Sequence, residues 1–367
     1  MQDDTGSFPL RRSRLLLWFV LGVVAGIVAL VIELSPPGSH LSGILRVGAE
    51  SPARTVIEME LGQVPVTNGV GHDGQYSYLV ARDPFATEGY ANLADDGGYR
   101  FRRALYGWLA GGLGQFTPRE TLWGLLIWAI VGLGLATAAI ADVAASLNAR
   151  RWAIAGVVAN IGLWLSIQLA TPDALGMGLS LVALALVLRK RTTSAGWLFA
   201  AAALTKETFM LFPLALTCWL ITQHRFRRAI ATSAPPLVVL VAWSGWLSIQ
   251  LGDGFSTKGN LALPLTGLLD SLPWSNDTSG VLAGLAILGV ILAISGFVLD
   301  RSALLRWLTA PWIATAIISS SLVWKDGNNA ARALAPCWML GVLALAHWRA
   351  QSKQPAAGPV RDSTSPP

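Results

Sequence analysis

Charged residues are scarce in this chain. Only 13% of its 367 residues are Asp, Glu, Lys or Arg, and 53% are hydrophobic. Soluble domains carry about 25% charged residues, so this composition cannot cover the chain with a solvated surface. Cysteine is scarcer still. Cys218 and Cys337 each lie in an apolar run, and we interpret both as packing residues rather than as a disulfide or a metal pair.

The apolar residues are collected into long runs without charge. Residues 15–32, 121–141 and 279–299 contain no Asp, Glu, Lys or Arg, and each run approaches the roughly 20 residues that a helix needs to cross a bilayer. No A-x-A-like cleavage site follows the first run, which indicates an uncleaved span rather than a signal peptide. The sequence therefore predicts an all-α, polytopic transmembrane bundle.

Short basic clusters stand at the ends of these runs. They occupy residues 11–14, 150–151, 189–191 and 225–228, and they account for much of the net charge of +6. Such clusters are typical of cytoplasmic loops under the positive-inside rule, so we expect no nucleic-acid partner. The pattern predicts about ten crossings of the cytoplasmic (plasma) membrane, with both termini in the cytoplasm.

The predicted topology divides the chain into three parts. Residues 1–14 form a cytoplasmic N-terminus, 15–350 a single transmembrane domain and 351–367 a disordered tail rich in Pro and Ser. Within the domain, residues 35–119 and 252–278 are outer loops. The expected crossings are 15–34, 120–142, 152–170, 174–188, two within 193–223, and then 229–251, 279–299, 307–323 and 333–348.

Residues 193–223 are too short for two full spans. They form either two short helices or a re-entrant hairpin, which is tolerated where it lines protein or water. Both versions place Lys206 and Glu207 at a tip that faces the outer side. An ionisable residue at such depth costs about 2.5–3.5 kcal/mol and is functional by default. The alternative is a mutual ion pair that holds the tip.

The first outer loop carries the candidate carboxylate Asp73, followed by a stretch, 76–81, that suits a short helix. Spacing alone favours Asp73 as a helix cap, and Asp83 before Pro84 predicts a helix end. Further along, Arg100, Arg102 and Arg103 alternate with aromatic residues. Arginine on the outer side is explained either by phosphate binding or by anchoring of an interfacial helix.

Two more charged residues are expected on the outer side. Asp173 lies in a short turn after Pro172, where a helix-capping role is the simple interpretation. Arg332 stands at the outer end of the last crossing, as an interfacial anchor or as a site residue. A carboxylate, an arginine cluster and a membrane-level lysine that face one compartment suit an enzyme that acts on lipid phosphates.

In layout and in four short segments, the chain resembles the GT-C superfamily of integral-membrane glycosyltransferases. One span precedes a long outer loop with an Asp, which is followed by a Tyr/Arg-rich entry into a loop helix and then by paired spans. The segments are His72-Asp73-Gly74-Gln75-Tyr76, Tyr99-Arg100-Phe101-Arg102-Arg103-Ala104-Leu105-Tyr106, Leu204-Thr205-Lys206-Glu207-Thr208 and residues 329–336, which include Arg332.

This resemblance implies an inverting transfer of sugar from a polyprenyl-phosphate donor to a glycan, lipid or protein acceptor. Asp73 is then the general base. The residues implied to bind the donor are Arg100, Arg102, Arg103, Lys206, Glu207 and Arg332. Asp173 falls where some members carry a second acidic residue, sometimes with a divalent cation, although this chain has a lone Asp there and no D-x-D.

Two other functions stay open at this point. A transporter or flippase for a lipid-linked or anionic substrate uses similar outer cations, and paired broken helices in both halves are typical of such proteins. The sequence has one interrupted hairpin, at 193–223, and no counterpart. The third interpretation is a non-catalytic assembly subunit of the membrane, in which Asp73 only caps a helix.

Overall fold

The computed structural model describes residues 12–252, 259–272 and 277–352. The described chain is mostly helical, with two strands of two residues each, which is consistent with the predicted all-α class. Residues 1–11 of the predicted cytoplasmic N-terminus and residues 353–367 of the predicted tail lie outside the described residues. So do residues 253–258 and 273–276 of the predicted second outer loop.

The elements follow one another along the chain in this order: α1 (Arg12–Leu34), η1 (Leu41–Leu45), β1 (Val47–Gly48), α2 (Ala53–Leu61), β2 (Val66–Thr67), α3 (Asp73–Arg82), η2 (Tyr90–Leu93), α4 (Gly97–Phe101), α5 (Ala104–Ala110), α6 (Pro118–Ser146), η3 (Arg151–Ile154), α7 (Ala155–Val158), α8 (Ile161–Gln168), α9 (Asp173–Leu188), α10 (Thr192–Thr205), η4 (Glu207–Met210), α11 (Leu211–Thr222), α12 (Phe226–Leu251), α13 (Thr266–Leu269), α14 (Thr278–Leu299), α15 (Ala303–Ile318), α16 (Ser321–Trp324), α17 (Gly327–Ala333) and α18 (Ala335–Gln351).

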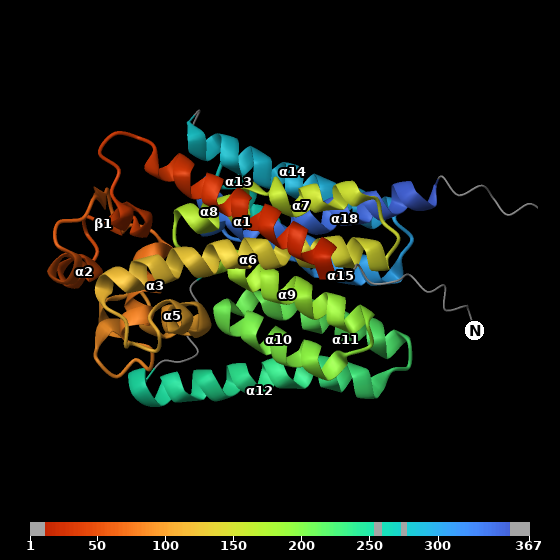
Figure 1. Cartoon of the computed structure of the whole chain (residues 1–367), viewed down its shortest axis with the longest axis horizontal. Helices are drawn as coiled ribbons and strands as arrows, with labels where there is room; N and C mark the ends of the chain where they lie inside the picture. The colour runs from red at the N-terminus through yellow and green to blue at the C-terminus, as the bar shows by residue number, and fades with distance from the viewer. Residues whose placement is uncertain (1–11, 253–258, 273–276, 353–367) are drawn as a thin grey trace, which may run out of the picture.

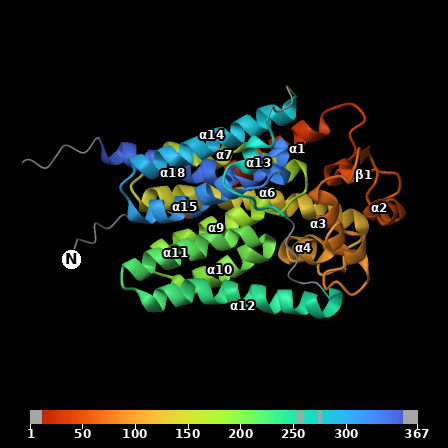
Figure 2. The ribbon, with the colours of Figure 1, turned by 180° about the vertical axis from the view of Figure 1, so that it is seen from behind.

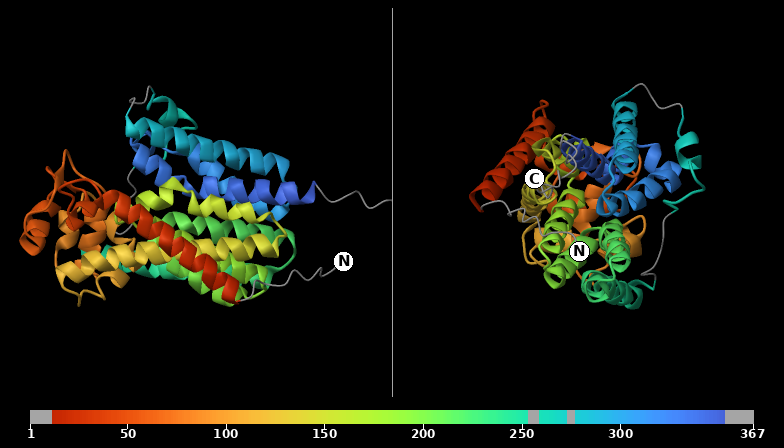
Figure 3. Two further views of the ribbon diagram at one scale, coloured as in Figure 1. Left: turned by 45° about the horizontal axis from the view of Figure 1, so that its top comes forward. Right: turned by 90° about the vertical axis from the view of Figure 1, so that its right-hand side faces the viewer.

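The long helices run roughly along one direction and form an elongated bundle (Figures 1 and 2). The start of α1 and the end of α18 lie at one end of this bundle, and the elements from η1 to α5 gather at the other. Helix α1 crosses the outside of the bundle obliquely (Figure 3, left). This arrangement fits the predicted topology, in which the loop 35–119 faces the side opposite the termini.

Four described helices are long and apolar enough to cross a membrane: α1, α6, α12 and α14. Helices α17 and α18 give a fifth if the pair, bent by 47°, is one span. All ten segments predicted as crossings contain helices, although α9, α11 and α15 are shorter. The membrane-protein class is therefore supported by these helices, and the number of ten crossings stays a prediction.

The segment 152–170 differs from the continuous helix that its apolar composition predicts. It is broken into η3, α7 and α8 at Asn160. The side chain of Asn160 accepts a hydrogen bond from the Gly162 N–H at 3.1 Å and donates to the Ala335 carbonyl at 2.9 Å. A side chain that bonds to nearby backbone offers an alternative to the helical ladder, so this residue ends one helix and begins the next.

The segment 193–223 forms two helices, α10 and α11, with a break at Lys206. Lys206 has an extended backbone (φ −162°, ψ 127°), which cannot continue the helix. The 14 residues of α10 span about 21 Å, at 1.5 Å per residue. This is less than the roughly 30 Å of a hydrocarbon core, so the tip with Lys206 and Glu207 lies within the depth of the bundle, next to α5.

Helices α6 and α9 approach each other closely because both carry glycine at the contact. A Cβ on Gly132 of α6 stands 2.4 Å from the Leu175 nitrogen, and a Cβ on Gly178 of α9 stands 2.4 Å from the Gly132 carbonyl oxygen. Small residues allow helix backbones to meet in membranes. This contact fixes the beginning of α9, where Asp173 lies, against the middle of α6.

Candidate active site

Asp73 begins α3 and is held in place by its backbone neighbours. Gly71 has a positive φ of 76°, which favours glycine. The His72 N–H donates to the Arg46 carbonyl at 3.0 Å, and a Cβ on Gly74 stands only 2.5 Å from the Leu169 carbonyl oxygen. His72 occupies the cap position of α3. The capping interpretation of Asp73 is therefore wrong, and its carboxylate points elsewhere.

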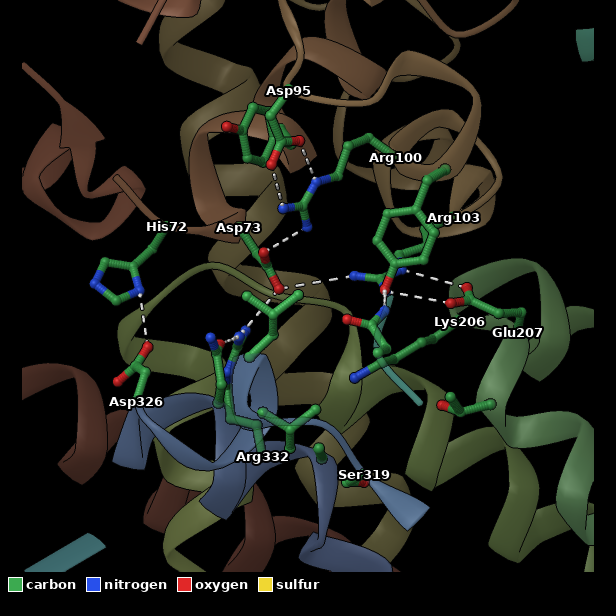
Figure 4. Close-up of a pocket in the computed structure, with 18 of the residues that line it drawn as sticks. His72, Asp73, Asp95, Arg100, Arg103, Lys206, Glu207, Ser319, Asp326 and Arg332 are labelled. Carbon is green, nitrogen blue, oxygen red and sulfur yellow. Dashed lines mark hydrogen bonds and ion pairs between the residues drawn. The ribbon is translucent and has the colours of Figure 1, made fainter. Parts of the chain in front are cut away.

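The carboxylate of Asp73 binds arginines from two distant segments. Its Oδ1 accepts a hydrogen bond from Arg100 Nη1 at 2.6 Å, and its Oδ2 accepts one from Arg332 Nη2 at 3.0 Å. Arg103 Nη1 lies 3.7 Å from Oδ2. Figure 4 shows these side chains converging on Asp73. The structure therefore brings together the predicted base and three of the predicted cations.

Arg100 lies on the short helix α4, and Arg103 lies between α4 and α5, as the N-cap residue of α5. Asp96 caps α4 by accepting the Tyr99 N–H at 2.9 Å. Asp95 accepts hydrogen bonds from Arg100 Nε at 2.8 Å and from Nη2 at 3.0 Å. These bonds hold the edge of the guanidinium that faces away from Asp73. Arg103 reaches the same carboxylate from the turn between α4 and α5, so both guanidinium groups face Asp73.

The hairpin tip contributes one group of each charge. Glu207 accepts from Arg103 Nε at 3.3 Å and Nη2 at 3.2 Å, and Lys206 Nζ donates to Asp173 Oδ1 at 2.6 Å. Lys206 and Glu207 therefore bind different partners, and the interpretation of these two residues as a mutual ion pair is wrong. Glu207 therefore joins the tip to Arg103, before α5, and Lys206 joins it to Asp173 at the start of α9.

Arg332 is buried, with only 3% of its side chain exposed. Besides Asp73, its Nη2 donates to Asn329 Oδ1 at 2.7 Å, and its Nη1 lies 3.6 Å from Asp173 Oδ2. A side chain this deep is not a surface anchor, so that interpretation of Arg332 is wrong. Asp173 follows Pro172, the cap residue of α9, and serves as a counter-ion for Lys206 and Arg332 rather than as a cap.

Arg102 lies apart from the other two arginines of its motif. It follows α4, and its guanidinium lies 5.8 Å from the centre of the Tyr99 ring. The cavity described below is lined by Arg100 and Arg103 but not by Arg102. The structure therefore does not place Arg102 with the other predicted phosphate-binding residues.

These side chains line a cavity of about 380 Å³, which is within the range of small-molecule sites. One part of the wall is charged and another is apolar. The charged residues are Asp73, Asp95, Arg100, Arg103, Lys206, Glu207, Asp326 and Arg332, and the apolar or weakly polar part includes Leu261, Trp312, Thr315, Ser319, Leu322 and Val323. Among these charged residues, four cations face four carboxylates.

Asp73 is strongly stabilised as a carboxylate. Burial alone raises its pKa, but the positive charges of Arg100, Arg332, Arg103 and Lys206 outweigh burial and hold the pKa well below its usual value. At neutral pH the group is therefore ionised. Its affinity for a proton is low as long as these cations stay close to it.

A second pair of titratable groups lies at the edge of the cavity. His72 Nδ1 is 3.7 Å from Asp326 Oδ2, and the other oxygen of Asp326 accepts the Asn328 N–H at 3.0 Å as the cap of α17. Burial lowers the pKa of His72, and the nearby Asp326 charge raises it by less. The imidazole is thus neutral at neutral pH.

We expect the His72 imidazole to titrate below its ordinary pKa of 6.5, and at still lower pH in Asp326→Asn, which loses the carboxylate that favours the protonated ring. Because the unfolded chain binds this proton more tightly, stability contributed by neutral His72 is lost as the pH falls below 6.5. A pH titration of isotope-labelled histidine, followed by NMR, measures the midpoint. The chain has four His, and the signal that disappears in His72→Gln is assigned to His72. A midpoint above 6.5, or an upward shift in Asp326→Asn, contradicts this expectation.

The surroundings of Asp173 do not fit a divalent cation. Its Oδ1 binds Lys206 Nζ, and its Oδ2 accepts from Thr171 Oγ1 at 2.9 Å and lies near Arg332. Across residues 12–252, 259–272 and 277–352, no group of three or more His, Cys, Asp or Glu side chains is placed to hold a metal. Two cations already satisfy this carboxylate, so the predicted metal role of Asp173 disagrees with its contacts.

Several cavity residues were missed by the sequence prediction. Asp95, His72 and Asp326 lie in or next to the segments singled out, but no local pattern shows that Asp95 grips Arg100 or that Asp326 faces His72. Trp312 lines the cavity with 1% exposure, yet in the sequence it resembles the other tryptophans of the apolar runs.

The chain was compared with family models, with curated proteins and with solved structures, and nothing in these comparisons matched it.

Proposed function

We propose that this protein is a membrane glycosyltransferase that moves a sugar from a polyprenyl-phosphate donor to an acceptor hydroxyl, with Asp73 as the general base. The site is proposed to face the outer side of the cytoplasmic membrane, and the acceptor is a glycan, lipid or protein. One observation carries the proposal: the guanidinium groups of Arg100, Arg103 and Arg332 and the ammonium group of Lys206 line one cavity with the Asp73 carboxylate.

The cations suit a phosphate that becomes more negative during the reaction. The acceptor oxygen forms a bond to the anomeric carbon while the bond from that carbon to the phosphate oxygen breaks. The electron pair leaves with the phosphate, and the hydroxyl proton goes to the Asp73 carboxylate. The donor phosphodiester has one negative charge and the product phosphate two, so Arg100, Arg103 and Arg332 stabilise the charge that develops.

The apolar part of the cavity supports a donor with a lipid tail. Leu261 and Leu322 line the cavity and are 66% and 57% exposed. Leu263, two residues beyond Leu261, is 75% exposed. Exposed leucines next to a phosphate-binding cavity are costly in water but favourable in hydrocarbon. A polyprenyl chain that passes these residues can remain in the lipid while its phosphate reaches the arginines.

The test is sugar transfer by the purified protein from a panel of radiolabelled polyprenyl-phosphate sugars. We expect the wild type to transfer one of these sugars, and Asp73→Asn to reduce the rate by about 10²–10⁴-fold, the usual contribution of a general base. If neither protein transfers any sugar while both bind the lipid, the transporter or assembly function takes the place of this one. Full activity in a stable Asp73→Asn protein contradicts the role of Asp73.

A further inference from the structure

Asp73 occupies the point on which the cations of the site converge. Arg100 and Arg103 each direct Nη1 at its carboxylate, and Arg332 directs Nη2. A phosphate oxygen and a carboxylate oxygen accept the same charge-assisted hydrogen bonds from guanidinium groups. A phosphate that binds these three arginines through the same nitrogens must therefore take the place of the carboxylate.

Each arginine has a second anchor that does not involve Asp73. Arg100 is held by Asp95 and Arg103 by Glu207, in both cases through Nε and Nη2. Arg332 is held by Asn329 and lies beside Asp173. The nitrogens that face Asp73 are thus positioned by other groups, so this three-arginine cradle does not depend on the Asp73 carboxylate.

The charge balance of the site also indicates that a carboxylate must leave before an anion binds. The four cations that line the cavity face four carboxylates in its wall, and Asp173 lies just behind it against Lys206 and Arg332. The site has no surplus of positive charge, so an added anion is attracted only weakly while all these ion pairs persist. Release of one carboxylate leaves the arginines able to bind the anion.

We propose that the Asp73 carboxylate occupies the phosphate subsite of this cavity and that the phosphate of the donor displaces it. This inference rests on the proposed function, since it assigns the place of the donor phosphate. The displacement requires no movement of α3, because turning the first side-chain torsion of Asp73 to another staggered position moves the carboxylate away from the guanidinium groups. Once displaced, the carboxylate no longer has the arginines as close partners and binds a proton more readily. Donor binding therefore prepares the base, and the donor binds before the acceptor reacts.

The experiment measures binding of methyl farnesyl phosphate to the purified full-length protein by calorimetry. This phosphodiester has an isoprenoid tail and a single negative charge that is constant over the pH range used. We expect Asp73→Asn and Asp73→Ser to bind it more tightly than the wild type by at least about tenfold, because two close charged contacts no longer have to be broken. Farnesol, which lacks the phosphate, is expected to show no such gain.

Asp270→Asn is the matched control. Asp270 is an exposed carboxylate at the end of α13, and it is not among the residues that line the cavity. Its removal changes the net charge by the same amount, so we expect little change in affinity.

Unchanged or weaker binding in both Asp73 variants, with binding by the wild type intact, overturns the displacement but leaves the proposed function standing. Failure of both variants to fold overturns the claim that the arginine cradle is anchored without Asp73. Absence of binding to the wild type and to all variants removes the proposed function as well.

Discussion

Replacement of Arg332 by Gln is expected to abolish sugar transfer and to destabilise the fold. The buried guanidinium lies between Asp73 and Asp173, at 3.0 and 3.6 Å. Loss of the guanidinium removes one of the cations that each carboxylate contacts, although Asp73 keeps Arg100 and Asp173 keeps Lys206. The cost is therefore expected to stay below the about 3–5 kcal/mol of an uncompensated buried charge. The loss of one group that stabilises the leaving phosphate reduces the rate by at least about 10²-fold. Unfolding in detergent and the transfer assay measure the two effects separately.

Arg102→Gln provides the control for Arg332. Like Arg332→Gln, this change replaces an arginine by a glutamine. Arg102 belongs to the arginine motif of residues 99–106, but it does not line the cavity. We expect transfer close to the wild-type rate, because loss of a guanidinium outside the cavity leaves Arg100, Arg103 and Arg332 in place. Equal losses of activity in the two variants contradict the assignment of the phosphate cradle to Arg100, Arg103 and Arg332.

Gly132→Ala is expected to destabilise the bundle strongly, because the added methyl group meets backbone atoms of the neighbouring helix α9. The new Cβ lies 2.4 Å from the Leu175 nitrogen and 2.5 Å from its Cα, and neither backbone atom can rotate away. Overpacking of this kind costs about 1–3 kcal/mol or more. Helix α9 must shift, and Asp173 at its first turn shifts with it. We therefore expect lower stability in thermal unfolding and a lower transfer rate, although Gly132 touches no charged residue of the site.

Gly284→Ala is the matched substitution on α14. The added Cβ finds no atom within 4 Å, so the change affects only the intrinsic helix propensity, which favours Ala by about 0.5–1 kcal/mol. A stability close to or above that of the wild type is expected. If Gly132→Ala behaves in the same way, the close contact between α6 and α9 is not a constraint on the fold.

The sequence predicted the helices of the bundle well because their signal is local. Apolar runs bounded by arginines gave α1, α6, α12 and α14 to within a few residues. The break at Asn160 was not predicted, since a single polar residue in an apolar run can also remain inside a helix. Its effect depends on the Ala335 carbonyl, which is 175 residues away in the chain. No local pattern contains that information.

The candidate site was predicted as a set of residues but not as a set of pairs. Asp73, Arg100, Arg103, Lys206 and Arg332 were identified because they are charged, are expected on one side of the membrane and lie in the four segments that carry the resemblance. Which of them touch depends on the packing of helices that are far apart in sequence. The sequence also could not separate Arg102 from Arg103. Both residues lie in the turn between α4 and α5, where Arg102 has helical and Arg103 non-helical backbone angles, and no periodic pattern predicts that difference.

The contact between Asp73 and Arg332 joins residues that are 259 positions apart. At a synthesis rate of about 5–20 residues per second, this separation takes on the order of tens of seconds to translate. During that time the segment with Asp73 has already been synthesised, while α17, which carries Arg332, does not yet exist. The Asp73 carboxylate then has only Arg100 and Arg103 as nearby cations of the cradle, so the cavity is completed only after α17 has been made.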